Sequence, residues 1–405
     1  MTDRIRWLEA FAVSGLVVAL GTADATAQNK YDVGVTDTEI KIGNVMPYSG
    51  PASAYAAIGK TEAAYFRMVN DQGGINGRKI NFISYDDGFA PPKTVEQVRK
   101  LVESDEVYVL FNVVGTAGNS AIQKYLNQKK VPHLFISSGA AKFDDPEQFP
   151  WSMAWWPGFK SEARIYAKYI QQHYPDKTIG ILYQNDDSGK DYLAGLREAL
   201  GAETPKKILL ELPYEVTAPT VDSQVVQIKS ANVDIFINLG TPKFAAQAIK
   251  KIAEMGWKPI QFLGNAAAST SSTTSAAGID ASRDIISAVY LKDPADPQWK
   301  NDEGIKKFRA FMSKYYPDGD PENGTTVFGY GAAKAFVEVL IRCGDNLTRD
   351  NIMKQMTSLD MKIDVYLPGI TIRTSPTDYS PIDQLQMVKF NGERFEPFGP
   401  IIDSK

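Results

Sequence analysis

Short apolar runs alternate along this sequence with longer stretches of helical period, and this alternation restricts the chain to few folds. The apolar runs of the first series have the length of β-strands and stand at residues 40–46, 79–85, 107–113 and 133–137. The stretches of helical period lie between them, at residues 54–70, 92–103 and 119–128. Strands that alternate with helices of about 10–15 residues predict a parallel sheet covered by helices on both faces.

A second series of the same kind follows an aromatic- and proline-rich passage at residues 149–159. Its predicted helices span residues 161–174, 190–200, 223–230 and 243–255. Its predicted strands span residues 178–184, 207–214, 234–239 and 260–264. Two complete series predict two α/β lobes, and a chain of 405 residues is too long for one typical hydrophobic core.

The pattern becomes less regular after residue 264. A Ser/Thr-rich run at residues 269–275 is predicted to be a loop, and it lacks the glycine pattern and the lysine of a phosphate-binding loop. Asn391-Gly392 is a hairpin-turn signal. Further helices are predicted at residues 299–316, 327–343 and 351–358, and further strands at 284–290, 368–373, 385–390 and 394–398.

Composition excludes several classes of function. The net charge of −4 provides neither the basic footprint of a nucleic-acid-binding protein nor the polybasic patch of a membrane-binding one. Cys343 is the single cysteine, so the chain has no intramolecular disulfide, and we expect a buried structural thiol. The two histidines, His133 and His173, lie in unlike contexts and form no metal motif. We therefore expect no metal and no cofactor.

The amino-terminal residues have the pattern of a secretory signal peptide. Arg4 and Arg6 precede a mostly apolar run at residues 8–20, and Ala25-Thr26-Ala27 fits the small-residue cleavage site. We predict a signal peptide at residues 1–27 and a mature protein that is exported to the periplasm. The alternative is an amino-terminal membrane anchor, although the apolar run is shorter than the roughly 20 residues that span a bilayer.

Several short motifs occur in order over most of residues 38–400, and together they are specific. They are Ile40-Lys41-Ile42-Gly43, Pro47-Tyr48-Ser49-Gly50-Pro51, Val69-Asn70-Asp71-Gln72-Gly73-Gly74-Ile75-Asn76-Gly77, Tyr85-Asp86-Asp87, Pro92-Lys93, Lys130-Val131-Pro132, Asp186–Gly189 with Tyr192, and Asn232-Val233-Asp234. By these motifs the chain resembles the periplasmic branched-chain amino-acid-type binding proteins of ATP-driven importers, which are also called leucine-binding-protein-like receptors.

This resemblance implies a type I periplasmic binding protein: two doubly wound α/β lobes, joined by a hinge of three chain crossings, that close on a ligand. Lobe 1 would hold residues 28–157 and 289–363, and lobe 2 residues 158–288 and 364–405. The protein would be a monomer that takes a small molecule to the permease of an ABC importer.

Ligands of open α/β sheets bind beyond the carboxyl ends of the strands, and this rule selects two small-residue loops here. Gly115–Asn119 follows the strand at 107–113 and enters a helix, whose exposed N–H groups and dipole favour an anion. Ser138-Gly139-Ala140-Ala141 follows the next strand. The resemblance implies that these loops hold the ligand's carboxylate, with Thr116, Ala117 and Ala140–Ala141 in contact. Alternatively, Thr116 and Asn119 only cap the helix.

Aromatic residues are further candidates for the site. Tyr48 and Tyr55 come from the loop after the first strand and can stack on a ligand or hydrogen-bond to it; core or surface packing is the alternative. Trp155, Trp156 and Phe159 lie where the chain is expected to cross between lobes. We expect at least one of the three to form a wall of the pocket, and the alternative is that they only pack the hinge.

One position departs from the family pattern. Where amino-acid binders of this family have an acid for the ligand's ammonium group, this sequence has Asn265-Ala266-Ala267. Because an unpaired buried ammonium is costly, we predict an aromatic or aliphatic carboxylate without an α-amino group. Asp187 or Asp86-Asp87 could provide a charge from elsewhere.

Two other classes of function remain as alternatives. An enzyme is disfavoured, because adjacent carboxylates such as Asp86-Asp87 and Asp186-Asp187 point to opposite faces of a strand and no catalytic motif is present. A periplasmic ligand sensor that docks on a membrane signalling partner would use the same fold.

Overall fold

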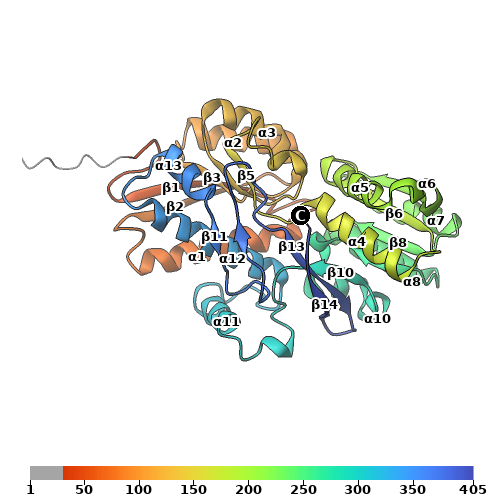
Figure 1. The fold of residues 1–405 in the computed structure, drawn as a ribbon. Helices are drawn as coiled ribbons and strands as arrows, with labels where there is room; N and C mark the ends of the chain where they lie inside the picture. The colour runs from red at the N-terminus through yellow and green to blue at the C-terminus, as the bar shows by residue number, and fades with distance from the viewer. Residues whose placement is uncertain (1–30, 405) are drawn as a thin grey trace, which may run out of the picture.

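The computed structural model describes residues 31–404 and shows two α/β lobes side by side (Figure 1). The predicted signal peptide, residues 1–27, lies outside the described residues. Across residues 31–404, no helix combines the length and the apolar character needed to cross a membrane.

The first lobe is built on a parallel sheet of strand order β2-β1-β3-β4-β5. Helices α2 and α3 pack on one face, where apolar side chains such as Val45, Leu110 and Ile122 form a core. Helices α1 and α12 cover the other face and pack against Phe111 and Phe135 (Figure 1). The elements are β1 Glu39–Met46, α1 Ala56–Asp71, β2 Lys79–Asp86, α2 Pro91–Glu103, β3 Val109–Phe111, α3 Thr116–Lys129, β4 His133–Ile136, β5 Ser152–Ala154, α11 Glu303–Tyr315, α12 Gly324–Cys343 and α13 Arg349–Met356.

The second lobe contains a sheet of order β14-β13-β10-β9-β8-β6-β7. The five strands from β10 to β7 are parallel, whereas β13 runs antiparallel to β10, and β14 at the edge runs antiparallel to β13. The parallel part agrees with the prediction for the strand–helix series, and the hairpin expected at Asn391-Gly392 is present, because the tight turn at Asn391 reverses the chain. The pairing of this hairpin with β10, which makes the sheet mixed, was not predicted. The elements are α4 Phe159–His173, β6 Ile179–Gln184, α5 Asp187–Leu200, α6 Thr204–Lys207, β7 Ile208–Tyr214, α7 Asp222–Ser230, β8 Ile235–Leu239, α8 Pro242–Glu254, β9 Ile260–Leu263, β10 Ile286–Val289, β13 Gln384–Phe390 and β14 Phe395–Asp403.

The chain passes between the two sheets three times: after β5, after β10 and before β13. Main-chain hydrogen bonds join the second and third crossings, from Lys292 to Val365 and from Leu367 to Tyr290. Trp155 of the first crossing donates its indole N–H to the Tyr366 hydroxyl at 3.0 Å. The three-crossing hinge is thus confirmed, while the exact lobe boundaries stay predictions.

Several element boundaries differ from the predictions. Helix α3 begins at Thr116 rather than at Asn119, and α12 begins at Gly324 rather than at Val327. The Ser/Thr-rich run is not a loop, since Thr270–Thr274 forms a wide helical turn and Ser269 accepts a hydrogen bond from the Ser272 N–H. The remaining short elements are α9 Ser275–Ala277, α10 Ile279–Ser282, β11 Asp360–Met361 and β12 Ile372–Arg373.

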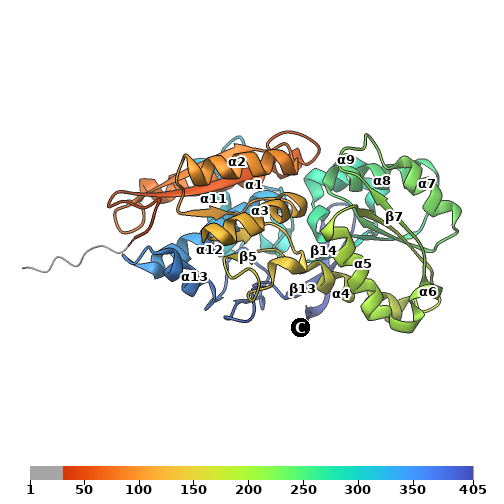
Figure 2. The same ribbon diagram turned by 90° about the horizontal axis from the view of Figure 1, so that it is seen from above.

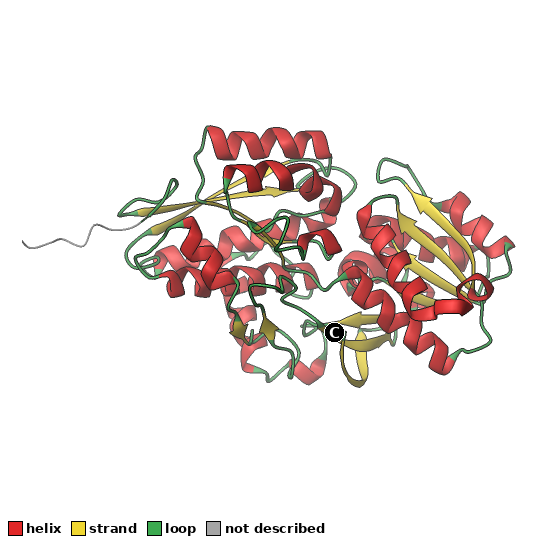
Figure 3. Ribbon diagram, turned by 45° about the horizontal axis from the view of Figure 1, so that its top comes forward, coloured by secondary structure: helices red, strands yellow, loops and turns green. Residues whose placement is uncertain are grey.

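Figure 2 shows α4 and α5 lying against each other, and Figure 3 shows that helices flank the strands of the second lobe. The close packing of α4 and α5 depends on Gly195, because a Cβ there would collide with the main-chain oxygen of Lys160. We expect Gly195→Ala to lower the free energy of unfolding by about 1–3 kcal/mol, as overpacking of a core does. Urea denaturation measures this loss. The control is Gly324→Ala, where nothing lies within 4 Å of the added carbon; equal stability of both variants would contradict the prediction.

Candidate functional site

The carboxyl ends of both sheets meet at a cavity between the lobes, which we call the cleft cavity. It has a volume of about 610 Å³, a figure that includes solvent space at its mouth. The first lobe contributes Tyr55, Phe89, Val114, Gly115, Thr116 and Ser137, and the hinge contributes Trp156. The second lobe contributes Phe159, Gln184, Ser188, Tyr192, Leu239, Gly240, Thr241, Gly264 and Ala266.

The amino end of α3 forms the polar end of the cleft cavity. Gly115 precedes the helix with a φ of 103°, a conformation that glycine adopts without strain. The Thr116 hydroxyl lies 2.7 Å from the Ser138 hydroxyl, which in turn accepts a hydrogen bond from the Ala140 N–H. The unpaired N–H groups of the first helical turn and the helix dipole favour a negative charge at this end.

Neither Thr116 nor Asn119 acts as a side-chain cap of α3. The Asn119 amide donates to the main-chain oxygens of Val113 and Gly115, and its oxygen lies 2.6 Å from His133 Nε2. Burial lowers the pKa of His133 to about 3, so the imidazole stays neutral. The alternative interpretation of these two residues as helix caps is therefore wrong, and Thr116 is among the residues that line the cavity.

Aromatic side chains form another part of the lining of the cleft cavity. The rings of Phe159 and Tyr192 stack with their centroids 4.9 Å apart, and Trp156 closes the cavity toward the hinge. Tyr55 spans the two lobes by donating its hydroxyl to the main-chain oxygen of Ala266 at 3.0 Å. This part of the lining therefore offers flat apolar surface to a planar or aliphatic group.

A buried carboxyl group, Glu162, fixes the second-lobe side of the site, and the sequence analysis did not identify it. It accepts hydrogen bonds from the hydroxyls of Tyr166 and Tyr192 and from the Asn265 N–H, each at 2.7 Å. Burial raises its pKa to about 7, although these three donors act in the opposite direction. Its position on the buried face of α4, with Phe159 and Tyr166, was the available sequence signal.

Asn265 occupies the position where the expected ammonium-binding acid would lie. Its side-chain amide donates to the Ala288 oxygen at 2.6 Å, so it also ties the loop to β10. No Asp or Glu side chain is among the described residues that line the cleft cavity. The acids considered as substitutes are engaged elsewhere: Asp86 with Ser49 and Lys93, Asp87 with Thr94, and Asp187 with Lys142.

The structure brings together only some of the predicted site residues. Tyr55, Thr116, Trp156 and Phe159 line the cleft cavity. Ser138 contacts Thr116 through the two hydroxyl groups. Asn265 lines a second cavity, which is described below. Ala117 faces a neighbouring groove with Asp87 and Asn185.

The other predicted residues are buried or form hydrogen bonds to other residues of the protein. The Tyr48 hydroxyl bonds to the Ser84 hydroxyl at 2.6 Å, and the fully buried Trp155 holds the hinge. The Gly139 oxygen accepts from the Phe159 N–H at 2.9 Å. Ala140 is buried, and the Ala141 N–H donates to Asp191 at 2.7 Å. These residues shape the site without lining the cleft cavity.

Apart from Phe159, sequence reasoning missed the second-lobe residues of the cleft cavity. Gln184 ends β6, and Gly240-Thr241 follows β8, so both lie at carboxyl ends of parallel strands. The rule that selected Thr116 in the first lobe would have selected them too. Phe89 and Tyr192 carried no such positional signal.

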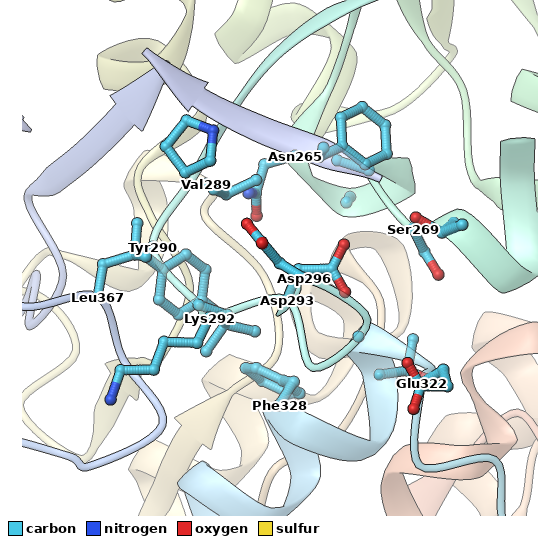
Figure 4. A pocket seen from close by; sticks show the side chains of 18 of the residues that line it. Asn265, Ser269, Val289, Tyr290, Lys292, Asp293, Asp296, Glu322, Phe328 and Leu367 are labelled. Atoms are coloured by element: carbon cyan, nitrogen blue, oxygen red, sulfur yellow. The ribbon is translucent and has the colours of Figure 1, made fainter. Parts of the chain in front are cut away.

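A second cavity, which we call the hinge cavity, adjoins the first and shares Trp156 and Ala266 with it. Its volume is about 790 Å³, again including open solvent space. Figure 4 shows Asp293 and Asp296 at its centre, Tyr290 and Phe328 on one side, and Ser269 and Glu322 on the other.

Two α/β lobes that place a ligand-sized cavity at their facing sheet edges define a two-lobed binding protein. A family model described as "Periplasmic binding protein" matches residues 39–394, and the chain belongs to that family. The family consists of solute-binding proteins, which agrees with the expectation that the chain is not an enzyme.

Individual proteins show the same likeness. A Brucella abortus protein named "Leu/Ile/Val-binding protein homolog 1" is 25% identical over 344 residues, which cover 82% of this chain and 89% of that protein. A Thermus thermophilus branched-chain amino acid ABC transporter structure with bound valine superposes with a TM-score of 0.81 at 15% identity, over 91% and 97% of the two chains. A Rhodopseudomonas palustris solute-binding protein in complex with 3,4-dihydroxybenzoic acid gives 0.75 at 20% identity, over 91% and 98%.

The raised pKa of Glu162 makes stability depend on pH. The carboxyl of Glu162 has a pKa near 4.5 in the unfolded chain and about 7 in the folded protein. Between pH 4.5 and about pH 7, Glu162 is therefore ionised in the unfolded chain and protonated in the folded protein. Stability from this group therefore falls as the pH rises through that window, by about 3 kcal/mol in total. We expect Glu162→Gln to remove this part of the slope when urea denaturation is compared at pH 5 and pH 8. An identical slope in the variant and the wild type would contradict the assignment.

Proposed function

We propose that this protein captures a small aromatic or aliphatic carboxylate in the cleft cavity and delivers it to the permease of an ATP-driven importer. The observation that carries the proposal is the cavity's polarity. The amino end of α3 and the Thr116 hydroxyl favour an anion at one end, and Phe159, Tyr192 and Trp156 offer apolar surface at the other. A carboxylate would accept hydrogen bonds from the helix end while its hydrocarbon part packs on the rings.

The missing acid at Asn265 directs the proposal toward ligands without an α-amino group. Relatives and structural neighbours include binders named for branched-chain amino acids and two complexes with aromatic acids, so both classes are compatible with this fold. Because no acidic side chain of the described residues lines the cleft cavity, an α-ammonium there would be unpaired.

Capture would proceed by closure of the lobes about the hinge. Polar contacts across the cleft, from Tyr55 to Ala266 and from Lys142 to Asp187, join the lobes. The Lys142–Asp187 pair is partly exposed, and pairs of this kind contribute roughly 0–1 kcal/mol. The lobes can thus separate at low cost and be held together by a ligand that contacts both.

Export through a cleavable signal peptide and action as a periplasmic monomer complete the proposal. A periplasmic sensor that docks on a membrane signalling partner is the alternative, and it would bind the same ligands in the same cavity. Binding measurements define the ligand, whereas uptake by cells that lack the protein separates transport from signalling.

The test is a thermal-shift and calorimetric screen of ligand-stripped protein. We expect benzoate-type and aliphatic carboxylates to raise the melting temperature, because a ligand that binds only the folded state stabilises it by mass action. Leucine and valine should bind at least tenfold more weakly, since an unpaired ammonium costs more than about 1.4 kcal/mol. Tight binding of leucine without any binding of aromatic acids would contradict the ligand assignment.

Thr116 provides a direct test of the carboxylate end. Thr116→Val keeps the shape of the side chain and removes its hydroxyl, and we expect it to weaken carboxylate binding about tenfold by calorimetry. The matched control is Thr377→Val, an exposed threonine of the loop after β12. Equal affinity of both variants would place the carboxylate elsewhere.

A further inference from the structure

The hinge cavity has an aromatic wall and an excess of carboxylates. Its aromatic residues are Trp156, Tyr290, Trp299, Phe328 and Phe395. Its charged residues are Lys292, Asp293, Asp296 and Glu322. The lining thus combines flat π surfaces with three acids and one base.

Most of these charges are already paired. Lys292 donates to Asp302 and to the main-chain oxygen of Asp364, and Figure 4 shows its amine turned away from Asp293 and Glu322. Asp296 pairs with Arg394 at 3.1 Å, and Glu322 pairs with Arg309.

Among the described acids that line the hinge cavity, Asp293 is the one that forms no ion pair. One of its oxygens accepts the Ala295 N–H at 2.9 Å, and no Lys or Arg within residues 31–404 forms an ion pair with it. Burial, aided by the neighbouring charges of Asp296 and Glu322, raises the pKa of Asp293 to about 6, although main-chain hydrogen bonds from Ala295 and Phe395 act in the opposite direction. A positive charge in the cavity would relieve both effects.

A second observation, independent of the acids, also indicates an absent ligand. Tyr290 is 1% exposed, and its hydroxyl has no hydrogen-bond partner in the described part of the chain. Trp156 is 9% exposed, and its indole N–H is likewise unpaired. Both residues line the hinge cavity, and unpaired buried polar groups are uncommon in folded proteins.

We propose that the hinge cavity binds a protonated amine carried at the far end of the same ligand whose carboxylate lies at Thr116. Asp293 would accept hydrogen bonds from the ammonium group, the Tyr290 hydroxyl oxygen would accept another, and the faces of Trp299 and Phe328 would add cation–π attraction. The Trp156 N–H, at the junction of the two cavities, would donate to an acceptor in the middle of the ligand.

One ligand molecule would occupy both the cleft cavity and the hinge cavity. The two cavities adjoin at Trp156 and Ala266, which line both. The proposed ligand would extend from the amino end of α3 past the Trp156 ring to Asp293. The ligand class is thus an ω-ammonium carboxylate, in which a ring or an alkyl chain separates the two charges. This inference rests on the proposed carboxylate site and adds the opposite end of the ligand.

The experiment compares ligands that differ only at that end. Calorimetry would measure para-(aminomethyl)benzoate against para-methylbenzoate and para-(hydroxymethyl)benzoate, and ω-aminohexanoate against hexanoate. We expect each amine to bind about tenfold more tightly than its methyl partner, the gain of one charge-assisted hydrogen bond. Equal affinities within the pairs, or a hydroxymethyl compound that binds as tightly as the amine, would overturn the inference while leaving the carboxylate site in place. Failure of every compound to bind would overturn both.

Substitutions test whether the preference for amines depends on Asp293. Asp293→Asn should abolish the preference for amines and leave the affinity for para-methylbenzoate unchanged, whereas Asp318→Asn, an exposed acid nearby in the chain, should preserve it. Tyr290→Phe keeps the ring and should reduce the preference without affecting para-methylbenzoate, which provides a second measurement if Asp293→Asn does not fold. A preference for amines that survives in both Asp293→Asn and Tyr290→Phe would contradict the proposal.

Discussion

The geometry of both cavities depends on the hinge. Main-chain hydrogen bonds pair the crossing at Tyr290–Lys292 with the crossing at Val365–Leu367, and Trp155 joins the first crossing to them through the Tyr366 hydroxyl. This short bonded unit holds the carboxyl ends of the parallel strands of the two sheets against each other, so loops that are distant in sequence line one space. It also explains why Trp155 and Trp156 differ in role: the first is a structural part of the hinge, and the second faces both cavities.

The sign of the charge that the protein favours changes along the space between the lobes. At one end, the unpaired N–H groups of α3 with Thr116 favour an anion, and the described lining of the cleft cavity contains no acid. At the other end, Asp293 lies among aromatic rings and forms no ion pair with any Lys or Arg of residues 31–404. Between them Glu162 accepts three hydrogen bonds and positions Tyr192 and Asn265. Its oxygens are thereby occupied, and its role is to orient the residues around it.

Apart from the short elements β5 and α6, sequence periodicity predicted the order of strands and helices through β9 and the division into two lobes, because each strand of a parallel sheet is a continuous apolar run. It failed where local signals conflict with tertiary packing: the Ser/Thr-rich run forms a helical turn at Thr270–Thr274, and the last hairpin makes the second sheet mixed. The strand-end rule identified Thr116, but Tyr48 and Ala141 could not be excluded from sequence. Their partners, Ser84 and Asp191, lie 36 and 50 residues away along the chain. Asp293 was not predicted, because the sequence does not show that Arg394 pairs with Asp296 and Arg309 with Glu322, which leaves Asp293 without an ion pair among the described residues.

Closure of the lobes on the ligand is the central claim, and a reversible cross-link tests it most directly. Ser120 donates to Asp187 across the cleft at 3.4 Å, so Ser120→Cys with Asp187→Cys places two thiols at the cleft mouth, while the native Cys343 is buried. With any carboxylate that the wild-type protein binds, the oxidised variant should show no association by stopped-flow fluorescence, and a reducing agent should restore it. If the oxidised and reduced forms bind the ligand at the same rate, the lobes need not separate, and the account is wrong.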